Sequence, residues 1–281
     1  MKTIYGQEDL FCSNKQKTYD KYATEAGFLL GGIGTGNVSV GSRGELRSWQ
    51  IFNEPGADNI LPYSFFAIRT ECNGEVSAKI LEAEVNAPYS KPEGFLRCEL
   101  GGLPRFKKSA MSSKYPFVWV DLEDENMPVD VRLEAFTPFV PLNADDSGIP
   151  GAYIRYYVKN KRDIRVKASI AGSMANAAGF DKYDVWMHMK LAGKPKNEYR
   201  SNEMCAGLFY SGEDIPEHHI GNGNMAFATT CKNISVKPLW LQGEWTDGAQ
   251  DFWDDFVEDG KYMWYIYIKI RYEVNKIGYF V

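Results

Sequence analysis

The sequence is poor in the residues that build metal sites and disulfide frameworks. It has only three histidines, and two of them, His218 and His219, are adjacent, so their side chains point apart on an extended chain. Its five cysteines are scattered, odd in number and without a C-x-x-C pair, which is typical of reduced thiols in a cytoplasm. We therefore expect no metal site and a cytoplasmic location.

Long apolar runs and a strong excess of one charge are also absent. No stretch approaches the roughly 20 apolar residues of a membrane-spanning helix, and the first residues lack the apolar core of a signal peptide. The net charge is -5, with acidic and basic residues interspersed, which gives no reason to expect a nucleic-acid partner. At 281 residues, one large domain without a transmembrane segment is expected.

Glycine is abundant, and its densest cluster is Leu30-Gly-Gly-Ile-Gly-Thr-Gly36. A dinucleotide-binding fingerprint would place its third glycine at Asn37, and a phosphate-binding loop would need lysine there. The residues that follow, Asn37-Val-Ser-Val40, alternate as in a strand, so no helix N-terminus faces a phosphate. The glycines indicate turns and close backbone packing, and no cofactor is expected.

Short runs that alternate apolar and polar residues recur along the chain. The clearest are Val129–Phe136, Ile164–Ile170 and Val185–Lys190. Such alternation is typical of strands with one face in water. Turn signals separate these runs, among them Asn73-Gly74 and the Asp- and Gly-rich residues 143–151. The pattern predicts an all-β protein, a large antiparallel β-sandwich with one or two short helices.

One segment, residues 246–260, has a helical period instead. Phe252, Trp253, Phe256 and Val257 fall on one face of a helix, and Gly260 suits its end. We predict a short amphipathic helix whose acidic residues form a solvated face.

The chain shows no self-contained catalytic constellation. Retaining glycoside hydrolysis needs two carboxyl groups about 5–5.5 Å apart, and the carboxylates available include Glu45, Glu54, Asp58, Asp145 and Asp146. An Asp- and Ser-rich turn favours side-chain capping over catalysis. No G-x-S-x-G nucleophile motif occurs. We expect no catalytic residue in this chain.

The run Arg43-Gly-Glu-Leu-Arg-Ser-Trp-Gln-Ile-Phe-Asn53 is the richest candidate for binding. On a regular strand, Glu45, Arg47 and Trp49 share one face. Acid, guanidinium and indole together could contact a sugar or a partner domain. The alternative is an internal ion pair beside a core tryptophan, and both interpretations stay open.

Several stretches, taken in order, resemble the N-terminal domain of glycoside hydrolase family 116, the family of bile-acid beta-glucosidase, also called non-lysosomal glucosylceramidase. The resemblance covers residues 24–260. The stretches that carry it are Leu30–Gly36, Arg43–Arg47, Trp49–Asn53, Phe136–Asn143, Asp146–Pro150, Gly207–Phe209, Gly223–Thr230 and Phe252–Phe256.

The resemblance implies a β-sandwich that precedes an (α/α)6 catalytic domain, normally in the same chain. That domain cleaves beta-glucosides with retention through a glutamate nucleophile and an aspartate acid/base. Because both carboxylates belong to that domain, no catalytic residue carries over to this chain. The expected function is that of a non-catalytic N-terminal domain, a fragment inactive alone, and the alternative is a stand-alone carbohydrate-binding or scaffold module.

Both ends of the chain differ in character from residues 24–260. Residues 1–23 are polar, and we expect them to be loosely ordered. Residues 261–281 are crowded with Tyr, Ile and Lys and lack strict alternation. A closing edge strand and a truncated or shifted reading frame both remain open for this tail.

Overall fold

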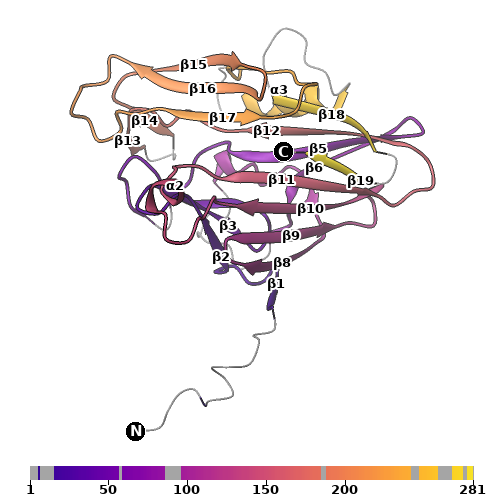
Figure 1. Ribbon diagram of the computed structural model, residues 1–281. Coiled ribbons are helices and arrows are strands. Elements are labelled where there is room, and N and C mark those ends of the chain that lie inside the picture. The colour runs from indigo at the N-terminus through magenta and orange to yellow at the C-terminus, as the bar shows by residue number, and fades with distance from the viewer. Residues whose placement is uncertain are drawn as a thin grey trace.

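The computed structural model describes Gly6 and residues 16–56, 59–85, 96–184, 188–241, 247–258, 268–274 and 277–280, the last two ranges by backbone only. Strands dominate these residues, and the predicted all-β class is confirmed (Figure 1). Within the N-terminal segment, Thr18–Asp20 form a strand. Asp58 and residues 261–267 of the tail lie outside the described residues.

Two sheets form the body of the sandwich. One has six strands in the order β1-β8-β9-β10-β11-β19, and the other has five in the order β18-β12-β5-β6-β7. All neighbours are antiparallel except β6 and β7. The strands are β1 (Thr18–Asp20), β8 (Lys108–Lys114), β9 (Phe117–Glu123), β10 (Val129–Phe136), β11 (Tyr153–Asn160), β19 (Ile277–Phe280), β18 (Ile268–Val274), β12 (Val166–Ser173), β5 (Phe65–Cys72), β6 (Glu75–Ala83) and β7 (Arg105–Phe106).

Three smaller sheets and short helices complete the described fold, with β2-β3-β4 and β15-β16-β17 as three-stranded sheets and β13-β14 as a pair. Figure 1 shows β15, β16 and β17 along one side of the sandwich. The bounds are β2 (Gly27–Leu30), β3 (Asn37–Gly41), β4 (Leu46–Gln50), β13 (Phe180–Tyr183), β14 (Met189–Leu191), β15 (Lys194–Ser201), β16 (Ala206–Glu213), β17 (Met225–Thr229), the 3-10 turn η1 (Arg97–Glu99), α2 (Ala144–Ser147) and α3 (Asp247–Glu258).

The predicted strand periodicity produces the core. Strand β10 has the bounds predicted for it, and its inward residues Val129, Val131, Leu133 and Ala135 are almost fully buried. They belong to the same cluster as Ile68 of the opposite sheet. Strand β12 begins and ends slightly later than predicted, and part of the run at 185–190 lies outside the described residues. Alternation thus places one face of each main sheet in a shared interior.

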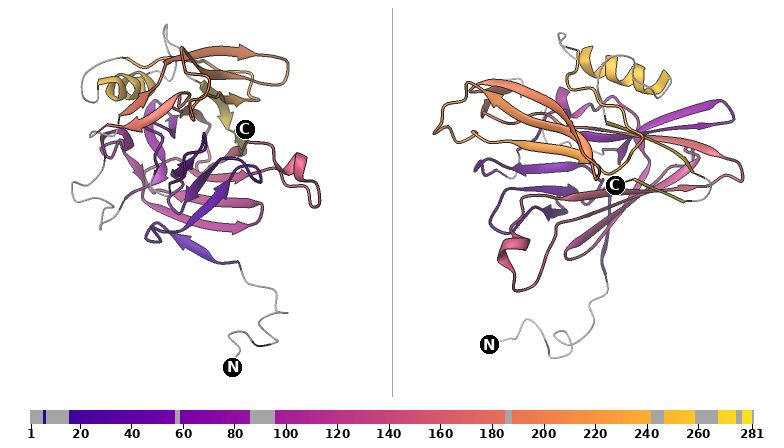
Figure 2. Two further views of the ribbon diagram at one scale, coloured as in Figure 1. Left: turned by 90° about the vertical axis from the view of Figure 1, so that its left-hand side faces the viewer. Right: turned by 45° about the horizontal axis from the view of Figure 1, so that its top comes forward.

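Helix α3 covers the outer face of the five-stranded sheet (Figure 2). Phe252 and Phe256 are completely buried there, packed with Phe65 and Ala67 of β5. Trp253 is partly buried and packs against the same cluster. The predicted amphipathic helix is therefore confirmed, and it gives the sheet a second, smaller core.

Candidate functional site

The glycine-rich loop after β2 packs against the loop that contains α2. A Cβ atom added to Gly32 would lie 2.5 Å from the carbonyl oxygen of Ile149 and 2.7 Å from the carbonyl carbon of Gly148. The backbone N–H of Ile33 donates to the carbonyl of Ser147 at 2.8 Å. These glycines therefore allow two backbones to touch, which is a packing role.

The α2 loop is organised by its own side chains. Asn143 caps the helix by accepting a hydrogen bond from the backbone N–H of Asp146 at 3.1 Å. The buried Ser147 hydroxyl bonds both the N–H and the carbonyl of Val140, each at 2.9 Å. Asp145 and Asp146 are exposed in the first turn, where carboxylates favour the helix N-terminus. This turn has the capping chemistry expected from the sequence.

Large apolar side chains project into solvent around these two loops. Their exposed fractions range from 38% to 108%, and the rings of Tyr115 and Phe139 touch, with centroids 5.1 Å apart. We call this set the loop patch. Because apolar side chains gathered at one surface commonly mark an interaction site, the loop patch is a candidate docking surface. Its members are Ile33, Tyr115, Phe139, Val140, Leu142 and Ile149.

A second candidate surface lies on the outward face of the six-stranded sheet. Phe117, Phe136 and Tyr153 are paired across β9, β10 and β11, with ring centroids 5.0 and 5.1 Å apart. We call these three residues the aromatic row. The next row holds Glu134, which accepts hydrogen bonds from the Trp119 indole at 2.9 Å and the Arg155 guanidinium at 3.0 Å. Flat rings beside fixed polar groups can contact a sugar.

The structure separates the three residues predicted to share one strand face. Ser48 has a positive φ of 53°. In the same stretch the register slips, with Asn37 opposite Gln50 and Ser39 opposite Arg47. This bulge breaks the alternation that the prediction assumed. Arg47 donates to the carbonyl of Thr24, away from the interior that holds Trp49.

Glu45 lies in the turn that joins β3 and β4. Its carboxylate accepts from the backbone N–H of Arg43 at 3.0 Å and pairs with the Arg43 guanidinium at 3.4 Å. Burial raises the pKa of Glu45, and the charge of Arg43 opposes that shift. The carboxylate therefore holds its own hairpin turn together.

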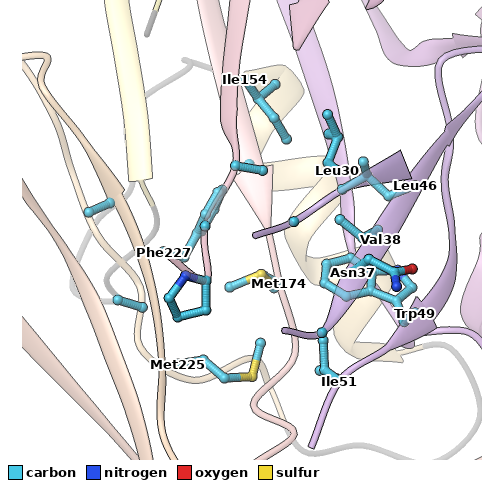
Figure 3. Close-up of a pocket in the computed structure, with 18 of the residues that line it drawn as sticks. Leu30, Asn37, Val38, Leu46, Trp49, Ile51, Ile154, Met174, Met225 and Phe227 are labelled. Carbon is cyan, nitrogen blue, oxygen red and sulfur yellow. The ribbon is translucent and has the colours of Figure 1, made fainter. Parts of the chain in front are cut away.

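Trp49 is 92% buried, since only 8% of its surface is exposed, and it packs with Leu61 and Ala177. It also lines a cavity of about 450 Å³ between β2, β3 and β4 on one side and β11, β12 and β17 on the other (Figure 3). The cavity is partly open to solvent, and Figure 3 shows Asn37 and Trp49 at its edge. Burial also raises the pKa of Tyr156, another lining residue, well above its usual value.

The described residues contain no cluster of three or more His, Cys, Asp or Glu side chains that could hold a metal ion. None of the helices in the described part of the chain has both the length and the apolar character needed to span a bilayer. The candidate sites of this domain are thus two surfaces and one apolar cavity.

Residues 27–270 match the family described as beta-glucosidase 2, glycosyl-hydrolase family 116 N-term. The chain belongs to this family. The match contains all the residues of the loop patch, the aromatic row and the cavity lining. The glycine-rich loop and the α2 loop, which carry much of the sequence resemblance, are therefore in direct contact within a family 116 N-terminal domain.

Sequence reasoning missed the cavity and the aromatic row. The row could have been found from the sequence, because Phe117, Phe136 and Tyr153 occupy solvent-facing positions of alternating strands. The cavity had none, because its walls come from seven strands and several loops that lie far apart in the sequence.

Proposed function

We propose that this chain is the non-catalytic N-terminal domain of a beta-glucosidase or glucosylceramidase-type enzyme. In this proposal it supports an (α/α)6 catalytic domain, normally in the same chain, that hydrolyses beta-glucosides. The cytoplasm is the proposed location, in keeping with scattered cysteines and the absence of a C-x-x-C pair. Membership of the family is the starting point for each part of this proposal.

The loop patch carries the proposal. Ile33 and Ile149 each leave more than half of their surface in water, at 56% and 52%, although both stand in tightly packed loops. Interfaces between domains of one chain typically bury about 600–1,500 Å² and contain apolar side chains of this kind. Since the loops are fixed by backbone contacts, the patch is preorganised for a partner.

The test measures binding of the full chain to a separately produced (α/α)6 domain of a family 116 beta-glucosidase, by calorimetry. We expect Ile149→Asp to weaken binding more than tenfold, because a carboxylate would be desolvated at the interface. Val76→Asp is the matched control, since Val76 is exposed on the β5–β6 hairpin. Equal effects of the two substitutions would show that the loop patch is not the docking surface.

The non-catalytic part of the proposal is tested by assaying the purified chain against an aryl beta-glucoside. We expect no turnover without the (α/α)6 domain, because the lining of the cavity of about 450 Å³ contains no Asp or Glu and so offers no carboxylate pair. If the chain alone hydrolyses the glucoside, and its specific activity stays constant through successive purification steps, this part of the proposal is wrong.

The second candidate is a stand-alone carbohydrate-binding module, and the aromatic row favours it. Titration with aryl and alkyl beta-glucosides, followed by tryptophan fluorescence, separates the two functions. A saturable shift that is lost in Tyr153→Ala, but kept in Tyr199→Ala on β15, would support sugar binding by the row. Trp49→Ala tests in the same way whether the buried indole takes part. A flat response of the unaltered chain would exclude the module.

A further inference from the structure

The cavity beside Trp49 is partly open to solvent and large for a space within a packed domain. Its volume of about 450 Å³ is roughly three times the 150 Å³ of an engineered apolar cavity that binds benzene. Protein interiors pack at the density of organic crystals and rarely leave voids larger than a water molecule. A volume of this size falls within the range of small-molecule sites.

The residues that line the cavity disfavour a charged ligand. The residues that line the cavity are aliphatic, aromatic, methionine or uncharged polar, and none of them is Asp, Glu, Lys, Arg or His. An ion would therefore lose its hydration without gaining a counter-charge, at a cost of several kcal/mol. The cavity fits a neutral molecule with mainly apolar surface.

Three polar atoms on the lining residues lack hydrogen-bond partners. They are the amide oxygen of Asn37, the indole N–H of Trp49 and the hydroxyl of Tyr156. Trp49 and Tyr156 are only 8% and 2% exposed, so both side chains are held inside the fold and not at its outer surface. Buried donors and acceptors are almost always satisfied, and each exception needs an explanation.

Asn37 pairs with Gln50, the residue after Trp49, so the two side chains come from neighbouring positions of β3 and β4, and both lie at the edge of the cavity in Figure 3. One offers an acceptor and the other a donor. A single ligand hydroxyl can accept from an indole and donate to an amide oxygen, whereas a ligand carbonyl can serve the indole alone. The pair therefore defines one polar end of a largely apolar space, whose lining also includes the Tyr156 hydroxyl.

The opposite wall is adaptable. Met174 and Met225 line the cavity, and their side chains are visible in Figure 3 facing Val38 and Ile51. Unbranched, polarisable methionine side chains adjust to ligands of different shape. The loop that follows Ile149 of the loop patch also contributes, through Pro150 and Gly151.

We propose that this cavity binds one neutral, largely apolar small molecule, about two to three rings in size, through a hydroxyl or carbonyl group that bonds Trp49 and Asn37. This site shares no residue with the loop patch or the aromatic row, although Pro150 follows Ile149 of the patch directly. Its ligand class follows from the volume, the uncharged lining and the unpartnered polar atoms.

The experiment titrates the full chain with prodan, an uncharged naphthalene dye that carries a ketone and reports polarity through its emission. We expect a saturable blue shift with one dye per chain. Val38→Phe should weaken dye binding at least tenfold, because the larger ring fills the cavity. Val76→Phe on the exposed β5–β6 hairpin is the matched control and should leave binding unchanged.

A second pair of variants tests the polar end. Trp49→Phe keeps an aromatic ring but removes the N–H, and we expect about fivefold weaker binding, the value of one neutral hydrogen bond. Trp119→Phe, whose indole bonds Glu134 on the outer sheet, should have no effect. If circular dichroism shows that Val38→Phe does not fold, the comparison of Trp49→Phe with Trp119→Phe tests the proposal by itself.

The proposal is overturned by three results. One is the absence of a saturable shift in the unaltered chain. Another is equal dye affinity of folded Val38→Phe and Val76→Phe. The third is equal affinity of Trp49→Phe and Trp119→Phe. Weaker binding of Ile149→Asp to an (α/α)6 domain would neither support nor contradict the ligand proposal, because Ile149 does not line the cavity.

Discussion

Gly32 lies so close to Gly148 that a Cβ atom on Gly32 would approach the Gly148 carbonyl group to within 2.7 Å. This contact joins the glycine-rich loop to the α2 loop and sets the position of Ile33 and Ile149 in the loop patch. The close approach explains why a glycine cluster with no phosphate-binding geometry stands at this point of the sandwich.

We predict that Gly32→Ala lowers the free energy of unfolding by about 2–3 kcal/mol, because the methyl group overlaps backbone atoms that cannot move aside. Urea denaturation measures the change. Gly102→Ala is the control, since a Cβ atom there meets nothing within 4 Å. Its free energy of unfolding should stay within about 0.5 kcal/mol of the value for the unaltered chain. A Gly32→Ala variant as stable as this control would show that the two loops separate readily.

The buried ion pair between Asp124 and Lys79, 2.7 Å apart, should make stability depend on pH. Burial by itself raises the pKa of Asp124, but hydrogen bonds from Lys79 and the Asn126 N–H outweigh it and lower the pKa overall. A lowered folded-state pKa gives stabilisation that is present above the unfolded value of about 4 and lost as pH falls below it. Denaturation between pH 7 and pH 3 should show this loss.

In Asp124→Asn the same titration should be shallower, and the variant should lose about 2–3 kcal/mol at pH 7, because the partly buried Lys79 loses its carboxylate and keeps the bond to the Arg105 carbonyl. The double variant Lys79→Met with Asp124→Asn should recover much of that loss, since no unpaired charge remains. An unchanged pH profile in the single variant would contradict the role of this pair.

Arg69 should hold the end of α3. Its guanidinium donates to the carbonyls of Val257 at 2.9 Å and Glu258 at 3.2 Å, and the side chain is buried. A cation at a helix C-terminus satisfies free carbonyls and favours the helix dipole. Arg69→Met should destabilise the domain by about 2–3 kcal/mol and speed hydrogen exchange in α3. Arg162→Met, at an exposed position, should change neither quantity.

Phe252 should be the main apolar anchor of α3. Its ring stacks on Trp240 with centroids 5.2 Å apart and meets Phe65 edge-on at 5.5 Å. Phe252→Ala should lower the free energy of unfolding by about 3–5 kcal/mol, because removing a completely buried ring leaves a cavity. Thermal or urea unfolding measures the change. Asp254 lies on the exposed face of α3, and Asp254→Ala should change the free energy of unfolding by no more than about 0.5 kcal/mol. Similar stabilities for the two variants would mean that α3 is not docked through this face.

The sequence by itself determined the elements whose signal is local. The alternation in Val129–Phe136 predicted β10 with its bounds, and the spacing of Phe252 and Phe256 predicted the buried face of α3. Asn73-Gly74 predicted the turn between β5 and β6, where both residues have positive φ. Periodicity and turn chemistry act between neighbours in the chain, so they can be read without a partner element.

Only the tertiary structure decided how distant segments meet. Arg69 contacts Val257 at the end of α3, 188 positions later in the chain, and no pattern near Arg69 in the sequence predicts that contact. The bulge at Ser48 moved Trp49 away from Arg47, because pairing with β3 overrode the regular two-residue period. The cavity beside Trp49 exists because two small sheets close against the main sandwich without filling the space between them. Such features follow from packing between elements, which local periodicity does not encode.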